Sequence, residues 1–205
     1  MSRFKLLKNA VRQWLQDPSW SASAPLPPSP LFSDADPISL INPLFSCLPV
    51  GGEVTDRAAF AIGLVMKKLY PLSPESAKNI VRRFMWHMNE ESGNIGWGIP
   101  EAFGQTLAQC PSLADTYRKI LFHYVYDAPE DQSTVFCDHA PLRISCYKAI
   151  GILLDARPDF AGEAMPILRI AVRDEKDKAC REAAQQLVRR YILAPMPAGA
   201  SEQKA

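Results

Sequence analysis

The stretch DRAAFAIGLV, residues 56–65, decides the fold, because its triplet AIG at 61–63 has two close counterparts further along the chain. The triplet AFG stands at 102–104, within GIPEAFGQTLA, and AIG returns at 149–151, within PLRISCYKAIGILL. The glycines are separated by 41 residues (104 − 63) and by 47 residues (151 − 104). Repeats of paired helices have a period of about 40 to 47 residues. The spacing therefore predicts a repeated helical unit.

Packing explains why these triplets recur at the same place in each unit. Small residues on one turn let the second helix of a pair approach its neighbours closely, at some cost in helix propensity. The middle residues, Ile62, Phe103 and Ile150, are predicted to fill the space between layers. The triplets thus mark the second helix of each pair.

The predicted fold class is all-α, an α-α superhelix of about four helix pairs with an additional N-terminal helix. The apolar pattern stays helical from about residue 36 to 194, and no segment alternates with the period of two that a strand shows. The last pair lacks the glycine and is more polar, which is typical of a terminal repeat. Reading outward from the triplets, we predict pairs at 37–48 with 55–70, 74–88 with 98–109, 112–126 with 140–156, and 159–172 with 177–193.

The N-terminal region is predicted to be separate from the repeats. Apolar residues recur on one face of residues 3–16, at Phe4, Leu7, Val11 and Trp14, as in an amphipathic helix that packs on the end of the array. A proline-rich segment, SASAPLPPSP, then predicts an extended linker. The predicted organisation is 1–35 for helix and linker, 36–194 for the repeats and 195–205 for a flexible tail.

Several of these segments resemble a known family. DRAAFAIGLV, GIPEAFGQTLA and PLRISCYKAIGILL are similar to the second helices of HEAT repeats, including the bacterial subtype named for its occurrence in phycobilisome lyases. RRFMWHMNEESGNIGWGIPEAFGQTLA and HAPLRISCYKAIGILLDARP resemble a set of small, uncharacterised bacterial HEAT-like proteins. The resemblance implies a HEAT-like α-solenoid over roughly residues 36 to 190. It implies no established activity and no catalytic residues.

Composition narrows the function classes. The net charge of +1 gives no global attraction to nucleic acid or to an acidic membrane. The five cysteines form no C-x-x-C pair, which favours free thiols and a cytoplasmic protein. No segment predicts a signal peptide or a membrane span, and no catalytic or nucleotide-binding motif is found. We therefore predict a protein that is not an enzyme and needs no cofactor.

One connection departs from the helical pattern. NEESGNIGWGIPE, residues 89–101, carries three glycines, a tryptophan and three carboxylates between two predicted helices. Gly93, Gly96 and Gly98 can take positive φ. The carboxylates favour a cationic or hydrogen-bonding partner over an anion. The alternative interpretation is that Trp86 and Trp97 bury their rings between repeats and that the polar residues only complete a long turn.

A second long connection, YDAPEDQSTVFCDHAP at 126–141, occupies the same place in the next repeat and should emerge on the same edge. We predict that the two connections lie side by side and bind a protein partner. The predicted partner-binding residues are Trp86, Asn89, Glu90, Glu91, Trp97, Glu101, Asp127, Glu130 and Asp131.

Three other interpretations stay open at this point. A tetrapyrrole or another small molecule could bind at Trp86, Glu90 and Trp97, as the lyase relatives imply. The basic pairs at 67–68, 82–83 and 189–190 are compatible with nucleic acid, since armadillo-like DNA glycosylases have similar helical shells. No metal site is predicted, because no known zinc-ligand spacing occurs. Whether any of the residues His87, His123, His139 and Cys137 binds a metal is not settled by the sequence.

Overall fold

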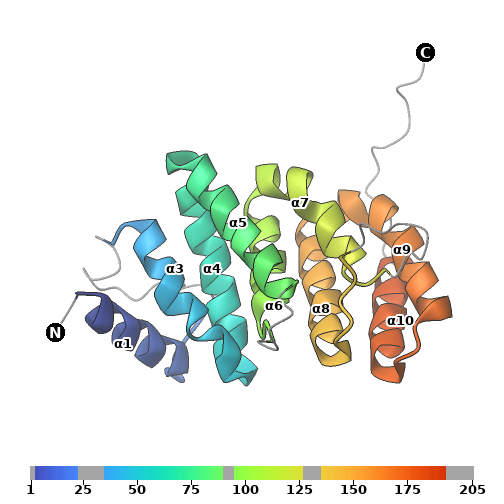
Figure 1. The fold of residues 1–205 in the computed structure, drawn as a ribbon, viewed down its shortest axis with the longest axis horizontal. Helices are drawn as coiled ribbons and strands as arrows, with labels where there is room; N and C mark the ends of the chain where they lie inside the picture. Colours follow the sequence, from blue (N-terminus) through green and yellow to red (C-terminus); the bar gives the residue numbers. More distant parts are fainter. Residues whose placement is uncertain (1–2, 23–34, 90–94, 127–134, 193–205) are drawn as a thin grey trace, which may run out of the picture.

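The chain folds into a row of packed helices (Figure 1). The structure is a computed structural model that describes residues 3–22, 35–89, 95–126 and 135–192. Within these four ranges every regular element is a helix. The elements are α1 (Arg3–Gln16), α3 (Pro37–Phe45), η1 (Leu48–Val50), α4 (Gly52–Leu72), α5 (Pro74–Met88), α6 (Ile99–Gln109), α7 (Pro111–His123), α8 (Ala140–Ala156), η2 (Pro158–Phe160), α9 (Ala161–Asp174) and α10 (Lys178–Ile192).

The helices form the predicted pairs, α3 with α4, α5 with α6, α7 with α8, and α9 with α10. The second helices, α4, α6, α8 and α10, also pack on one another in succession, and they make up an inner layer. The all-α class and the paired arrangement are those predicted for an α-α superhelix. Helices α5 and α8 have the predicted bounds, and the bounds of the other paired helices differ from the prediction by up to three residues. α7 ends at residue 123 instead of 126, and η2 precedes α9.

The glycines of the three triplets lie where the inner helices meet. A Cβ on Gly63 would stand 2.7 Å from the Gln105 backbone oxygen, and one on Gly104 would stand 2.7 Å from that of Ala149. Since these neighbours are backbone atoms, a larger side chain would force the helices apart. The predicted reason for the glycines is confirmed at these two joins. At Gly151 the nearest atom belongs to the Leu187 side chain, 3.0 Å away, so the third join is less tight.

The α1 helix packs on α3 and α4 at one end of the row (Figure 1). Leu7 and Val11 are buried as predicted, and so is Leu15, whereas Phe4 is exposed. The prediction for Phe4 was wrong, since its side chain, in the first turn of α1, is 53% exposed. The Arg57 guanidinium on α4 donates to the backbone oxygens of Leu15 and Asp17, both at 3.0 Å, and so satisfies carbonyls at the end of α1.

The proline linker and the tail lie mainly or wholly outside the described residues.

Candidate functional site

The structure describes only part of the predicted partner-binding set. Trp86 and Asn89, at the end of α5, are exposed, and Trp97 is 41% exposed. The two tryptophan rings are therefore not buried between repeats, and that part of the alternative interpretation was wrong. Five other members of the set, Glu90, Glu91, Asp127, Glu130 and Asp131, lie outside the described residues.

Gly98 positions Trp97 and the start of α6. It is the N-cap of α6 and has a φ of +74°, which favours glycine. A Cβ there would lie 2.8 Å from both the Leu48 backbone oxygen and the Thr55 Cγ2 atom. The backbone of the first connection at Gly98 therefore lies directly against the turn between α3 and α4. Positive φ is confirmed at Gly98, while Gly96 is not among the glycines with positive φ, and Gly93 lies outside the described residues.

Glu101 was predicted to be one of the partner-binding residues, and the structure places it in a buried position. It lies in the first turn of α6, where the helix dipole favours a negative charge, but it is only 6% exposed. Its Oε2 atom is buried and has no hydrogen-bond partner among the residues that the structure describes. The close approach at Gly98 places the start of α6 against the turn between α3 and α4, and the Glu101 side chain there lies inside the protein. A buried carboxylate oxygen without a partner is energetically unfavourable.

Glu101 lines a hollow of about 440 Å³, called here the Glu101 pocket. Three successive inner helices contribute to it, α4 through Thr55 and Asp56, α6 through Glu101, and α8 through Ser145 and Lys148. Trp97 forms part of the wall. The Lys148 ammonium pairs with the Asp56 carboxylate. Both side chains of this pair are about half exposed, so the pair contributes little to stability.

A second hollow, of about 360 Å³, adjoins the first and shares Leu48, Pro49 and Trp97 with it. The exposed apolar side chains of Phe4, Ile95 and Trp97 line it. We call the two hollows together the Trp97 groove.

A cation lies in the wall of this second hollow. The Arg83 guanidinium stacks on the Phe45 ring at 4.0 Å and donates to the Asn42 side-chain oxygen at 2.6 Å. The residues that the two hollows share are apolar, so the middle of the Trp97 groove is apolar. Glu101 lines one hollow and Arg83 lines the other.

The two long connections meet beside this groove. The Trp97 ring lies edge-on to the His139 ring, with 5.6 Å between centroids. Trp97 belongs to the first connection, and His139 is the N-cap of α8 at the end of the second. The predicted adjacency is confirmed for these two ends.

A pair of thiols lies between the second connection and α8. Cys137 and Cys146 are both buried, and they hydrogen-bond to each other. Burial raises the pKa of Cys146 well above its usual value, and the hydrogen bond and charge of Cys137 and then the charge of Glu101 raise it further. Glu101 therefore acts electrostatically on this pair of thiols. The Cys146 hydrogen bond lowers the pKa of Cys137. All five cysteines are free thiols, as predicted. In the part of the chain that the structure describes, no three His, Cys, Asp or Glu side chains are grouped to hold a metal.

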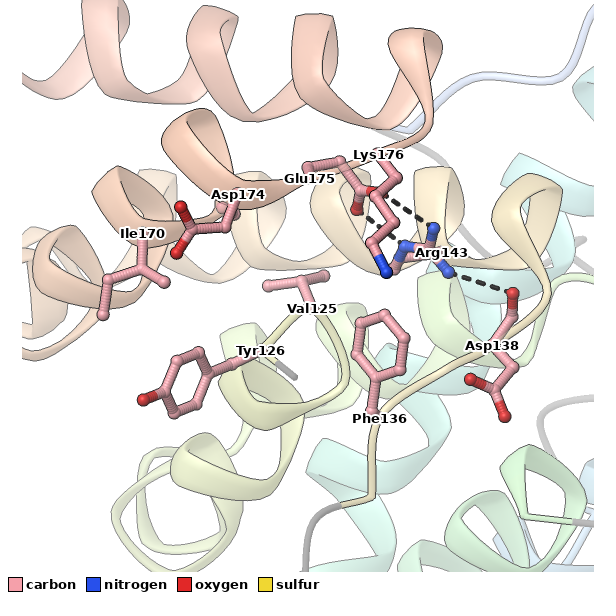
Figure 2. A pocket seen from close by; sticks show the side chains of 10 residues that line it. Val125, Tyr126, Phe136, Asp138, Arg143, Ile170, Asp174, Glu175 and Lys176 are labelled. Carbon is pink, nitrogen blue, oxygen red and sulfur yellow. Dashed lines mark hydrogen bonds and ion pairs between the residues drawn. The ribbon is translucent and has the colours of Figure 1, made fainter. Parts of the chain in front are cut away.

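A third hollow, of about 410 Å³, lies further along the row (Figure 2). Arg143 on α8 and Glu175, between α9 and α10, form an ion pair there, with side chains only 6% and 5% exposed. The Arg143 Nε and Nη2 atoms donate to Glu175 at 2.8 and 3.0 Å. The Arg143 Nη1 atom donates to the backbone oxygens of Cys137 at 2.5 Å and Asp138 at 3.1 Å. This arginine therefore ties the second connection to the last repeat.

The protonation state of Glu175 is set by its partners. Burial alone would raise its pKa, but hydrogen bonds from Arg143 and from the Asp177 amide, at 2.9 Å, together with the Arg143 charge, hold the pKa below its usual value. Sequence reasoning missed Arg143. A signal existed, since a lone arginine in the apolar stretch PLRISCYKAIGILL needs a buried partner.

The arginines of two basic pairs contact residues of the same chain. Arg83 stacks on Phe45, and the Arg190 guanidinium pairs with the Asp155 carboxylate at 2.8 Å. Their charge is thereby partly engaged within the protein.

Comparison of the chain with protein-family models, with curated proteins and with solved structures gives no match. Among the helices of the described residues, none combines the length and the apolar character needed to cross a membrane.

Proposed function

We propose that this protein is a binding scaffold rather than an enzyme, a HEAT-like array that holds a protein partner in the Trp97 groove. The observation that carries the proposal is the grouping of exposed apolar side chains, Phe4, Ile95 and Trp97, along one hollow. Such groups gain free energy when a partner removes them from water. Tryptophan is also among the residues that contribute most to protein interfaces.

The position of the groove supports the same function. It is built from α1, α3, α5 and the start of α6, with α4 and α8 completing the Glu101 pocket. A partner lying in it would therefore contact several repeats at once, as ligands of stacked helical arrays do. The rim carries Asp56, Lys148 and Asn42, which can provide polar contacts around an apolar centre.

The test is capture of a partner by the tagged protein and by matched variants. Trp97→Ala should lose the partner that the unchanged protein retains in stoichiometric amount. Leu72→Ala is the control, since Leu72 is 73% exposed and lies at the far end of α4 from the groove. Retention of the partner by both variants alike would contradict the proposal.

Stability separates recognition from packing. Trp97 is partly exposed, so its replacement by alanine should cost less free energy of unfolding than the roughly 3 to 5 kcal/mol of a core aromatic. A cost in that range would instead identify Trp97 as a packing residue.

A further inference from the structure

The Glu101 carboxylate is the one acidic group of the Trp97 groove that its surroundings leave unsatisfied among the described residues. Its Oε2 atom is buried without a hydrogen-bond partner, while the other carboxylate of the pocket, that of Asp56, is paired with Lys148. Among the described residues that line the pocket, two carboxylates stand against one ammonium, so their net charge is negative. The charge of the pocket, together with a lining carboxylate that lacks a partner at Oε2, favours a cationic ligand.

The walls restrict the kind of cation. The Trp97 indole lines the same pocket as Glu101 and is partly open to solvent, so it can take an aliphatic stem on its face and attract a positive charge. The hydroxyl of Ser145 on α8 is a further acceptor in the pocket. A compact ammonium with three donors suits acceptors on different helices, whereas a planar guanidinium is matched to a bidentate carboxylate.

We propose that the Glu101 pocket receives a lysine side chain of the protein partner, with the ammonium at Glu101 and the aliphatic stem on Trp97. This inference rests on the proposed function, because the apolar hollow that continues past Trp97 would hold the neighbouring residues of the same partner segment. A protein is thereby favoured over a free amine as the source of the ammonium.

The first experiment uses small probes and needs no partner. Lysine with both backbone ends blocked is titrated while the indole N–H signal of Trp97, assigned with Trp97→Phe, is followed by NMR. The same compound acetylated on its side-chain nitrogen is the uncharged match. We expect the charged probe to bind about tenfold more tightly and Glu101→Gln to remove this preference. Equal binding of the two probes to the unchanged protein would overturn the inference.

A second variant tests whether a positive charge at the rim opposes binding of the charged probe. Lys148→Gln removes the positive charge at the rim and should strengthen binding of the charged probe, while unchanged or weaker binding counts against the inference.

Spermidine tests the source of the ammonium. If it binds about tenfold more tightly than blocked lysine, the assignment to a protein lysine is wrong.

Partner capture distinguishes this inference from the proposed function. Loss of the partner with Trp97→Ala and about tenfold weaker binding with Glu101→Gln would support both. Loss with Trp97→Ala and unchanged binding with Glu101→Gln would leave the groove as the binding site and overturn the lysine assignment alone. Unchanged binding with both variants would overturn both.

Discussion

Glu101 and Glu175 are two buried carboxylates of one small protein, and their surroundings differ completely. Glu175 accepts two hydrogen bonds from Arg143 and one from the Asp177 amide. The Oε2 atom of Glu101 accepts none. Removing a carboxylate from water is unfavourable unless it is paired and hydrogen-bonded. Glu175 meets that condition within the chain, whereas the Oε2 atom of Glu101 has no such partner among the described residues.

The role of a buried charge is indicated by its partners and not by burial alone. Burial of a charge does not itself indicate a site, because Arg143 and Glu175 together form a structural link between α8, the second connection and the last repeat. A buried charge that also lines a hollow and has a free acceptor atom indicates recognition. Both carboxylates border hollows of similar size, so pairing, and not the size of the hollow, separates them.

The largest effect is expected from breaking the Glu175 side of the comparison. Arg143→Leu would leave Glu175 buried without its cation and release the carbonyls of Cys137 and Asp138. We expect it to lower the free energy of unfolding by about 3 to 5 kcal/mol, measured by denaturant titration. The control is Arg173→Leu, which breaks an exposed pair with Asp174 and should leave the free energy of unfolding nearly unchanged. Equal costs would show that the buried pair is not a structural link.

A smaller effect is expected when the same change is made at both carboxylates. Glu175→Gln leaves Arg143 with a weaker partner and should cost about 2 to 3 kcal/mol. Glu101→Gln removes a charge whose Oε2 atom has no partner, so we expect the free energy of unfolding to stay the same or to rise slightly. Thermal melting of the two variants side by side checks this. A large loss with Glu101→Gln would mean that Glu101 is as structural as Glu175.

The dependence of stability on pH gives the smallest effect. The pKa of Glu175 is lower in the folded protein than its unfolded value of about 4.3. Its contribution is therefore fully present above about pH 4.3 and is lost as the pH falls through the folded pKa. The unchanged protein should thus be more stable than Glu175→Gln near pH 7, and this difference should shrink below about pH 4. Denaturant titrations at several pH values measure it, and a constant difference would contradict the assigned pairing.

The sequence was sufficient to predict the fold where residue type alone sets the geometry. At Gly63 and Gly104 a Cβ would meet the backbone of the next helix, and that constraint is visible as a repeated glycine at a fixed period. The inner helix 140–156 was predicted with the bounds that α8 has in the structure.

The candidate site could be predicted only in part. The adjacency of the connections followed from their equivalent places in the repeat, and Trp97 and His139 do meet. The direction of Glu101 did not follow, because it depends on how Gly98 seats α6 against the turn between α3 and α4. Nor could the partner of Arg143 be found, since Glu175 is 32 residues away in a turn. Pairing across repeats is a tertiary property that local patterns do not contain.

The close joins at Gly63 and Gly104 also have a mechanical consequence. Inner helices that touch through backbone atoms cannot be compressed further, while α5 and α7 of the outer layer make few direct contacts with each other. The array should therefore resist shortening along its inner layer and deform more easily by fanning its outer helices. We therefore expect the row to bend about its inner layer, with the joins at Gly63 and Gly104 moving least.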